Sequence, residues 1–306
     1  MEQAQLWADG LAFPEGPVIL ADGSCILVEI AAGRITRVRP DGRTETVATP
    51  GGGPNGAALG PDGALYVCNN GGFSWSETNG MRIPGHQAED YETGRIERID
   101  LSSGRVERLY DRCEGHRLSG PNDLVFDAEG GFWFTDLGKT RHHDRDQGGL
   151  FYARADGSLI RAAVYPLDGP NGVGLSPDGR TLYVAMTWQR LILAFDILGP
   201  GEVAPSPLPA VPGRVVASFP GRVLLDSMAV LASGKIAQAT LVEAPGIATV
   251  DPETGTYAIA PFDDLLTTNI AFGGPDMRDA AVCLPTTGRL VRARWPEPGL
   301  RLQFSG

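Results

Sequence analysis

The sequence has no long hydrophobic run, few cysteines and no sustained helical periodicity, and each absence narrows what the chain can be. No apolar run approaches the ~18 residues that a membrane-spanning helix needs, so no membrane partner is expected. Cys25, Cys68 and Cys283 fall in strand-like segments without CxxC spacing, where buried free thiols are common. The first ten residues lack the basic and apolar regions of a signal peptide. A reduced, cytoplasmic protein is therefore expected.

Several familiar functional motifs are also missing. The chain contains no GxSxG, no P-loop and no dinucleotide-binding fingerprint. Acidic residues outnumber basic ones by 37 to 26, and the formal net charge is −11. An acidic surface disfavours nucleic acid and anionic membranes as partners. A small-molecule substrate is the expected partner, and the sequence leaves the oligomeric state open.

The chain is instead rich in turn residues, with 41 glycines and 24 prolines, and these punctuate an internal repeat. One phrase recurs six times: a turn, a polar residue, a short apolar run, a second turn and another apolar run. The copies are FPEGPVILADG (13–23), GPNGAALGPDGALYV (53–67), GPNDLVFDAEGGFWFTD (120–136), GPNGVGLSPDGRTLYV (169–184), LLDSMAVLASGKIAQAT (224–240) and TTNIAFGGPDMRDAAVCLP (267–285). Two further strand-like runs follow each copy. Spacings of about 40–50 residues are typical of propeller blades. The sequence predicts an all-β fold, a six-bladed β-propeller with four-stranded antiparallel blades, as a single domain over residues 1–306.

Aligning the copies places one polar residue of each in a single column. These are Glu15, Asn55, Asn122, Asn171, Asp226 and Asn269. Equivalent positions of all blades face the central channel at one end, so the six side chains are expected to converge around the axis. Two carboxylates in a narrow channel repel each other unless they are protonated or bound to a cation. The carboxylates of Glu15 and Asp226, with the amide oxygens of Asn122 and Asn171, describe a site for a hard divalent cation.

Calcium is the first choice, with water completing its shell. Magnesium retains more water and zinc prefers His or Cys; these two cations, manganese and iron(II) remain alternatives. A single Asn or Asp before a strand is also a common turn residue that bonds its own backbone. Asn55 is a candidate substrate contact, and Asn269 stays outside the predicted site as a candidate turn residue.

The phrases PEGPV (14–18), GPNDLVFD (120–127), GPNGVGLSPDG (169–179) and LLDSMAV (224–230) carry a family resemblance over nearly the whole chain. The sequence resembles the senescence marker protein (regucalcin)/gluconolactonase/luciferin-regenerating family of six-bladed propellers. The resemblance implies that Glu15, Asn171 and Asp226 bind one divalent cation, with Asp226 also the acid/base. It places Asn122 at the metal or at the substrate. Animal-type sugar lactonases carry an arginine two residues before this asparagine, where this chain has Gly120.

The resemblance implies a metal-dependent lactonase, a carboxylic-ester hydrolase. The same ligands also resemble those of diisopropyl fluorophosphatase and the paraoxonases, so phosphotriester or aryl-ester hydrolysis is the alternative. A non-enzymatic calcium-binding propeller is a third hypothesis.

Two segments fall outside the repeat. The insertion Asn69 to Thr93 is predicted to be a loop that emerges near the channel, either as a lid or as a surface loop packed on its own aromatic residues. In the charged loop Leu137 to Gly149, His142 and His143 are expected to be solvated rather than metal ligands. Lys139 lies closer to the channel end and is a candidate contact for an anionic product.

Overall fold

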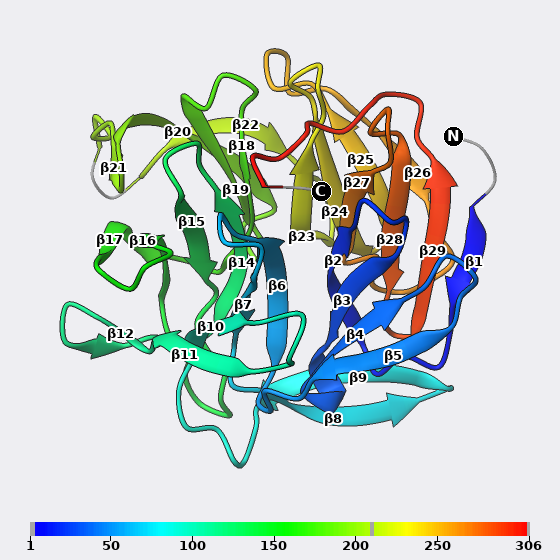
Figure 1. Cartoon of the computed structure of the whole chain (residues 1–306). Helices are drawn as coiled ribbons and strands as arrows, with labels where there is room; N and C mark the ends of the chain where they lie inside the picture. Colours follow the sequence, from blue (N-terminus) through cyan, green and yellow to red (C-terminus); the bar gives the residue numbers. More distant parts are fainter. Residues whose placement is uncertain (1–3, 209–210, 305–306) are drawn as a thin grey trace.

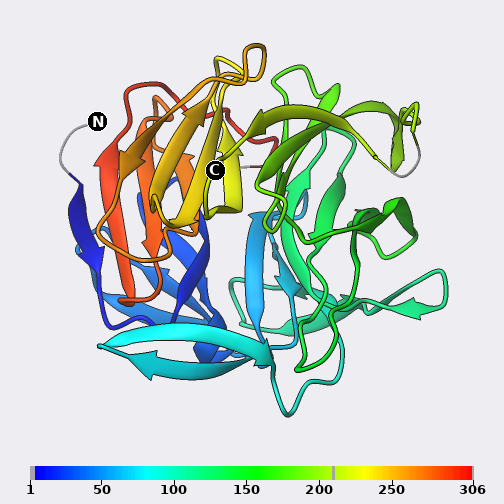
Figure 2. The same ribbon diagram turned by 180° about the vertical axis from the view of Figure 1, so that it is seen from behind.

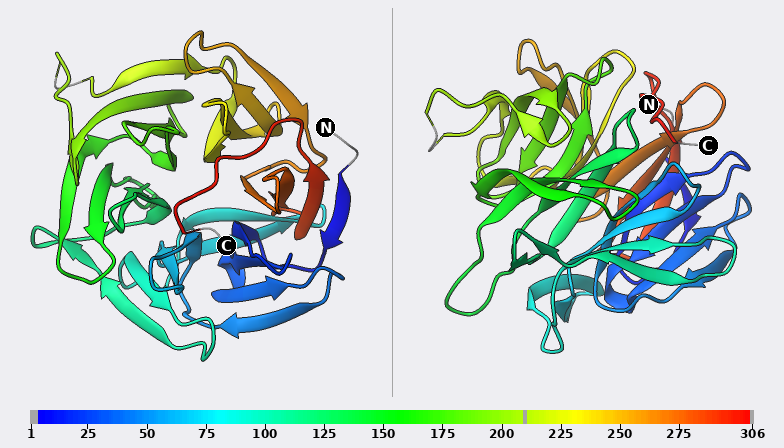
Figure 3. Two further views of the ribbon diagram at one scale, coloured as in Figure 1. Left: turned by 45° about the horizontal axis from the view of Figure 1, so that its top comes forward. Right: turned by 60° about the vertical axis from the view of Figure 1, so that its left-hand side comes forward.

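The computed structural model describes residues 4–208 and 211–304. Six antiparallel sheets surround a central axis, as the views from different sides show (Figures 1 and 3). Among the described residues, the short 3-10 turn Ile30–Ala32 is the only helical element. This part of the chain therefore contains no helix long and apolar enough to cross a membrane. The predicted six-bladed β-propeller is confirmed.

Each blade has four principal strands, listed here from the channel outwards. Blade one contains β2 (Pro14–Ile19), β3 (Cys25–Glu29), β4 (Arg34–Val38) and β5 (Thr44–Ala48). Blade two contains β6 (Pro54–Leu59), β7 (Leu65–Asn69), β10 (Arg95–Ile99) and β11 (Val106–Tyr110). Blade three contains β14 (Pro121–Phe126), β15 (Gly131–Asp136), β16 (Gly148–Arg154) and β17 (Ile160–Leu167). Blade four contains β18 (Pro170–Leu175), β19 (Thr181–Met186), β20 (Leu191–Gly199) and β22 (Arg214–Ser218), with β21 (Glu202–Val203) also paired to β20. Blade five contains β23 (Val223–Val230), β24 (Ile236–Val242), β25 (Gly246–Val250) and β26 (Tyr257–Pro261).

Blade six is built from both ends of the chain. It contains β27 (Asn269–Gly273), β28 (Asp279–Leu284) and β29 (Arg289–Arg294), and its outer strand is the N-terminal β1 (Gln5–Ala8). Leu6 pairs with Val291 in antiparallel register, while Trp7 and Ala8 are buried in the seam with blade one. Pairing β1 with β29 therefore closes the ring and gives blade six its fourth, outermost strand.

Five of the six inner strands share a local irregularity at the position of the polar column, whereas β27 pairs with β28 in regular register. The β2–β3 register shifts between Glu15 and Val18, and equivalent shifts occur in β6, β14, β18 and β23. A β-bulge adds a residue to one strand and turns the local side chains away from the regular alternation. The shared bulge explains how polar residues in an otherwise apolar strand can be aimed at one end of the channel.

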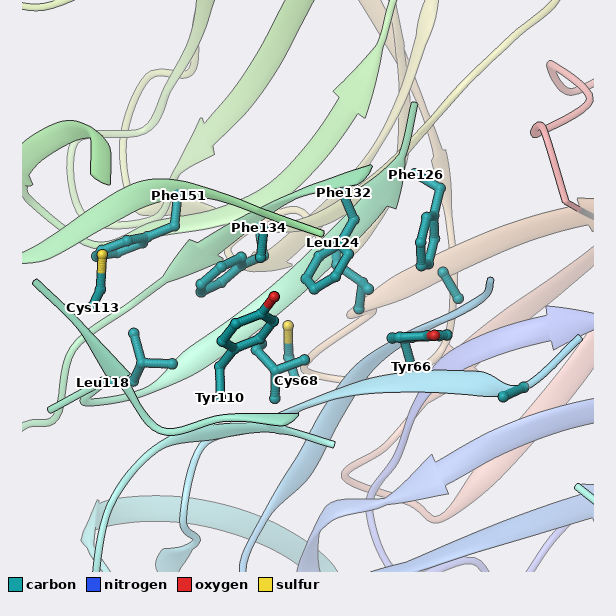
Figure 4. Packing of buried hydrophobic residues seen from close by; sticks show 14 residues of the cluster. Tyr66, Cys68, Tyr110, Cys113, Leu118, Leu124, Phe126, Phe132, Phe134 and Phe151 are labelled. Atoms are coloured by element: carbon teal, nitrogen blue, oxygen red, sulfur yellow. The ribbon is translucent and has the colours of Figure 1, made fainter. Parts of the chain in front are cut away.

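Aromatic side chains fill the interface between blades two and three (Figure 4). Tyr66 of β7 meets Phe126 of β14 edge-on, with ring centroids 5.1 Å apart. Phe134 stacks on Phe151 at the same separation. Such pairs contribute about 0.5–1.5 kcal/mol each beyond their burial. The free thiols of Cys25, Cys68, Cys113 and Cys283 are all buried, as predicted for the three in strand-like segments.

The insertion between β7 and β10 contains a β-hairpin where the sequence predicted a loop. Strands β8 (Phe73–Thr78) and β9 (Met81–Gln87) pair antiparallel, and the hairpin extends across one face of the propeller (Figure 2). A second small hairpin joins β12 (Arg112–Cys113) to β13 (His116–Arg117). The glycines of the insertion lie mostly outside its strands. They obscured the alternation of side chains that would have indicated two strands.

The C-terminal segment crosses the opposite end of the channel from the β8–β9 hairpin (Figures 1 and 3). The backbone N–H of Leu300 donates to the carbonyl of Val230 at 2.8 Å, and Phe304 meets Phe126 edge-on at 5.6 Å. A cavity of about 110 Å³ lies within the ring of inner strands, with Leu300 and Phe304 among its lining. The C-terminal segment therefore lines the end of the channel far from the polar column.

Candidate functional site

The six column residues lie near the starts of the inner strands, and those strands contact one another in cyclic order around the axis. The second residues of β2, β6, β14 and β18 are Glu15, Asn55, Asn122 and Asn171. Asp226 is the fourth residue of β23 and Asn269 the first of β27. Five of the six are buried, and Asp226 is only half-buried. Asp226 is thus the column residue with the most access to a ligand at this end of the channel.

Glu15 is held by two hydrogen bonds on one carboxylate oxygen. Its Oε2 accepts from the backbone N–H of Gly16 at 2.6 Å and from the Nδ2 of Asn269 at 2.7 Å. Burial raises the pKa of Glu15 despite these donors. Asn269, a candidate turn residue outside the predicted site, therefore positions the Glu15 carboxylate. Its place in the aligned column was the signal for this role.

Two asparagine side chains present buried oxygens without a partner. The Oδ1 atoms of Asn122 and Asn171 accept no hydrogen bond from the described residues. The Nδ2 of Asn171 donates to the Oγ1 of Thr187 at 3.1 Å, and that hydroxyl donates to the carbonyl of Leu225 at 2.8 Å. A buried oxygen without a donor is costly unless a ligand fills the gap. Both amide oxygens are consequently suited to a cation.

The carboxylates of the site disfavour one another's charge. The pKa of Asp226 is raised well above its usual value, first by burial and then by repulsion from Glu15. The Nε2 of Gln238 donates to the backbone carbonyl of Asp226 at 2.9 Å and fixes this part of β23. A divalent cation between the carboxylates would reverse the electrostatic balance, because a positive charge stabilises their ionised forms.

Asp123 is a third carboxylate that sequence reasoning did not assign to the site. Burial and the charge of Glu15 raise its pKa to about 7. It lines the internal cavity, whereas Glu15, Asn122, Asn171 and Asp226 do not. Its signal was in the alignment: the residue after the column is Gly56 in blade two and Gly172 in blade four. A Cβ at Gly172 would lie 2.7 Å from the carbonyl oxygen of Asp226, so the inner backbones approach too closely there for a side chain.

Of the other residues considered from the sequence, Asn55 lies in the polar column and His142 lies outside it. Asn55 is buried in the column, and its backbone carbonyl lies against Gly16. His142 is exposed and packs edge-on against His86 at 4.9 Å. Among the residues that the structure describes, no cluster of three or more His, Cys, Asp or Glu is arranged to hold a metal. A cation site here would therefore depend on the amide oxygens.

Lys139 was expected to be available to an anionic product, and the structure contradicts this expectation. Its side chain is 1% exposed, because the start of the insertion covers it. The Nζ donates to the carbonyl of Gly72 at 2.6 Å and to the Oδ1 of Asn70 at 3.3 Å. Lys139 is therefore a structural partner of the insertion.

Comparisons with known proteins agree with this architecture. The family described as SMP-30/Gluconolactonase/LRE-like region matches residues 13–284. A gluconolactonase of Zymomonas mobilis is 28% identical over 203 residues, covering 58% of this chain and 50% of that protein. The lactonase drp35 of Staphylococcus saprophyticus is 30% identical over 194 residues, covering 62% of this chain and 53% of its own. The chain thus spans about half the length of these curated relatives.

Solved structures share the fold. A gluconolactonase from Xanthomonas campestris superposes with a TM-score of 0.73 at 23% identity, covering 97% of this chain and 90% of its own. The calcium-binding protein regucalcin from Agrobacterium tumefaciens gives a TM-score of 0.70 at 18% identity, covering 98% of this chain and all of its own (100%). With the family match over most of its length, the chain belongs to the SMP-30/gluconolactonase/LRE-like family of six-bladed propellers.

Proposed function

We propose that this protein is a divalent-metal-dependent hydrolase that opens lactone rings. The observation that carries the proposal is the donor set at the starts of the inner strands. Two carboxylates with raised pKa values and two buried, unpartnered amide oxygens occur in one polar column. Relatives named gluconolactonase and lactonase support the same reaction class.

The cation would be held by Glu15, Asn122, Asn171 and Asp226, all of them oxygen donors. Calcium matches this set best, since it accepts carboxylate and amide oxygens in a flexible shell, while magnesium, manganese, iron(II) and zinc are alternatives. A cation bound there would act as a Lewis acid on the carbonyl oxygen of the substrate. The Agrobacterium neighbour described as a calcium-binding protein supports calcium as the first choice.

The substrate would bind at the open end of the channel. The internal cavity of about 110 Å³ is too small for a substrate, because pockets for small molecules are typically about 300–1,000 Å³. Asp226 is half-buried, whereas the other five column residues are buried. The substrate would therefore lie against Asp226, with Asn55 as a further contact.

Asp226 would serve as the acid/base. Its carboxylate accepts a proton from the attacking water as the new carbon–oxygen bond forms. The ring carbon–oxygen bond then breaks, and the same proton returns to the leaving alkoxide, which gives the open hydroxy acid. Asn122 would steady the substrate or the oxyanion that develops on its carbonyl oxygen. Glu15 is buried and bonded to Asn269, so its role would be to hold the site.

The proposal is tested by measuring ring opening, as proton release, on a panel of lactones with metal-stripped and reloaded protein. Metal-dependent turnover is expected, and Asp226→Asn is expected to lower kcat by at least about 100-fold. Asp251→Asn is the matched control, because this aspartate bonds turn amides of the same blade, Glu253 and Thr254. Normal turnover in Asp226→Asn would refute the mechanism.

The same panel distinguishes the other candidate functions. Metal-dependent hydrolysis of phosphotriesters or aryl esters, without lactone opening, would assign the diisopropyl fluorophosphatase or paraoxonase type of reaction. A metal-induced rise in Tm without turnover of any substrate would instead indicate a calcium-binding propeller.

A further inference from the structure

Lys139 is an unusual residue in this chain. The sequence has two lysines and 24 arginines, and Lys139 is buried while Lys235 lies at the surface in an ion pair with Glu297. The hydrogen bonds and ring contacts of the Lys139 ammonium all come from the insertion. They are the carbonyl of Gly72, the Oδ1 of Asn70, the Phe73 ring at 4.1 Å and the Tyr91 ring at 5.4 Å.

No carboxylate lies within 4.0 Å of the Lys139 ammonium among the described residues. Asp136 and Asp146 act on it at longer range, and both have other partners. Asp136 accepts from the backbone N–H groups of Ser119, Gly120 and Gly138, and Asp146 pairs with Arg141. Burying an ammonium without an ion-pair partner costs several kcal/mol. Global stability is therefore a poor explanation for this lysine, and its contacts with one segment suggest a local role.

The segment that Lys139 contacts continues as the β8–β9 hairpin, which reaches two other blades. Trp75 of β8 packs on Phe13 at 5.0 Å, two residues before Glu15 in the chain. The backbone N–H of Arg82 in β9 donates to the carbonyl of Thr286 in blade six at 2.8 Å. The hairpin thus spans from blade two past blade one to blade six (Figure 2). Lys139 anchors its base to blade three.

We infer that Lys139 is a positioning residue that fastens the base of the β8–β9 hairpin, so that the hairpin forms one wall of the substrate site. The hairpin, and not the buried ammonium, would contact the substrate. The inference rests on the proposed hydrolase function for its kinetic consequences. Its structural part, the fastening of the hairpin, is inferred from the contacts of Lys139 and does not depend on the proposed function.

The protonation of Lys139 gives the inference a pH signature. Burial, opposed by Asp136 and Asp146, lowers the pKa of Lys139 to about 7. In an open hairpin the ammonium would be hydrated and its pKa would return to about 10.4. Closure then releases a proton, so the closed form gains stability as pH rises from about 7 to 10 and loses it as pH falls. The other ionisable groups of this region are Tyr91, whose pKa is raised to about 12, and Arg141, Asp136 and Asp146. His86 of β9 also meets His142 of the Lys139 loop edge-on at 4.9 Å.

Lys139→Met tests the inference, because it keeps a long side chain and removes the amine that donates to the Gly72 carbonyl and the Asn70 side chain. Lys235→Met is the matched control. We expect Lys139→Met to raise KM for the best lactone about tenfold, to leave kcat within about twofold, and to abolish a fall of KM between pH 7 and 9. Unchanged KM and pH profile in Lys139→Met would overturn the inference.

A second measurement does not depend on turnover. Hydrogen exchange of residues 73–87 is expected to be faster in Lys139→Met than in the unsubstituted protein or in Lys235→Met, while exchange in blade five stays the same. Unchanged exchange in the hairpin would contradict the fastening role. Faster exchange, with no lactone opened by the unsubstituted protein, would retain that role and refute the proposed hydrolase function.

Discussion

Asn269 donates a hydrogen bond from its Nδ2 to the Oε2 of Glu15 at 2.7 Å, although the two residues are 254 positions apart in the chain. One begins the inner strand of blade six and the other lies in the inner strand of blade one. Closure of the ring therefore brings these two blades together at the polar column. The site depends on that closure, because Glu15 takes one of its two donors on Oε2 from the last blade.

Replacing Asn269 with alanine is expected to weaken metal binding. Glu15 would lose a donor that orients its carboxylate, and loss of such a buried bond typically costs about 1–3 kcal/mol, or about 5–150-fold in affinity. Calorimetric titration of calcium into stripped protein would measure the change. Asn55→Ala is the control: as a candidate substrate contact it should raise KM and leave metal affinity unchanged. Equal metal affinity in both variants would contradict the role given to Asn269.

Thr187→Val tests whether the Asn171 amide must be oriented. The substitution conserves shape but removes the hydroxyl that accepts from Asn171 and donates to Leu225. We expect the metal affinity to fall about tenfold, equivalent to the ~1.4 kcal/mol of one lost hydrogen bond. Thr240→Val is a suitable comparison, because Thr240 is also buried and donates to the carbonyl of Ala244. An equal loss of metal affinity in Thr240→Val would indicate a general structural effect.

Metal-stripped protein is expected to be more stable at pH 5 than at pH 8. Glu15, Asp123 and Asp226 have raised pKa values in the fold, so their native forms hold protons that the unfolded chain releases. The stabilisation is complete below the unfolded value near 4 and is lost as pH rises, through about 7 for Asp123. Thermal unfolding across this range tests the effect. Asp123→Asn should reduce the difference, and saturating calcium should reverse its sign; a stripped protein that is more stable at pH 8 would disprove this account.

Trp7→Ala tests the closure of blade six. Trp7 is 9% exposed, whereas its neighbour Leu6 is 55% exposed on the same strand. Removing the buried indole is expected to cost about 3–5 kcal/mol of unfolding free energy. Leu6→Ala should cost less than about 0.5 kcal/mol. Denaturant unfolding would compare the two variants, and similar losses would mean that β1 contributes little to closing the ring.

The repeat explains why so much of the fold was predictable. Each inner hairpin uses the same turn phrase, so alignment alone placed Glu15, Asn171 and Asp226 at equivalent positions. Strand β1 carries no copy of that phrase, and its pairing with β29 depends on contacts across the whole chain. The insertion hairpin was missed because its glycine-rich turns resemble a loop. The hairpin is held by contacts with other blades, through Phe13 and the backbone carbonyl of Thr286.

The details of the candidate site were harder to predict because they depend on tertiary contacts. Thr187 bonds Asn171 from the turn that follows β19 in blade four, and no sequence motif marks this pair. Asp123 follows Asn122 directly, and from the sequence it resembles a turn residue. Its burial near Glu15 results from the packing of the inner strands. The pKa of Lys139 depends on burial by a segment about 70 residues earlier in the chain.

Calorimetric titration of calcium into chelator-treated protein tests the central claim most directly, with Asn171→Ala measured beside it. The account predicts one bound cation per chain in the unsubstituted protein and affinity lower by at least about tenfold in Asn171→Ala, since an oxygen ligand is removed. Equal affinity in both proteins, or no binding of calcium or of any other divalent cation tested, would contradict a cation site formed by the polar column.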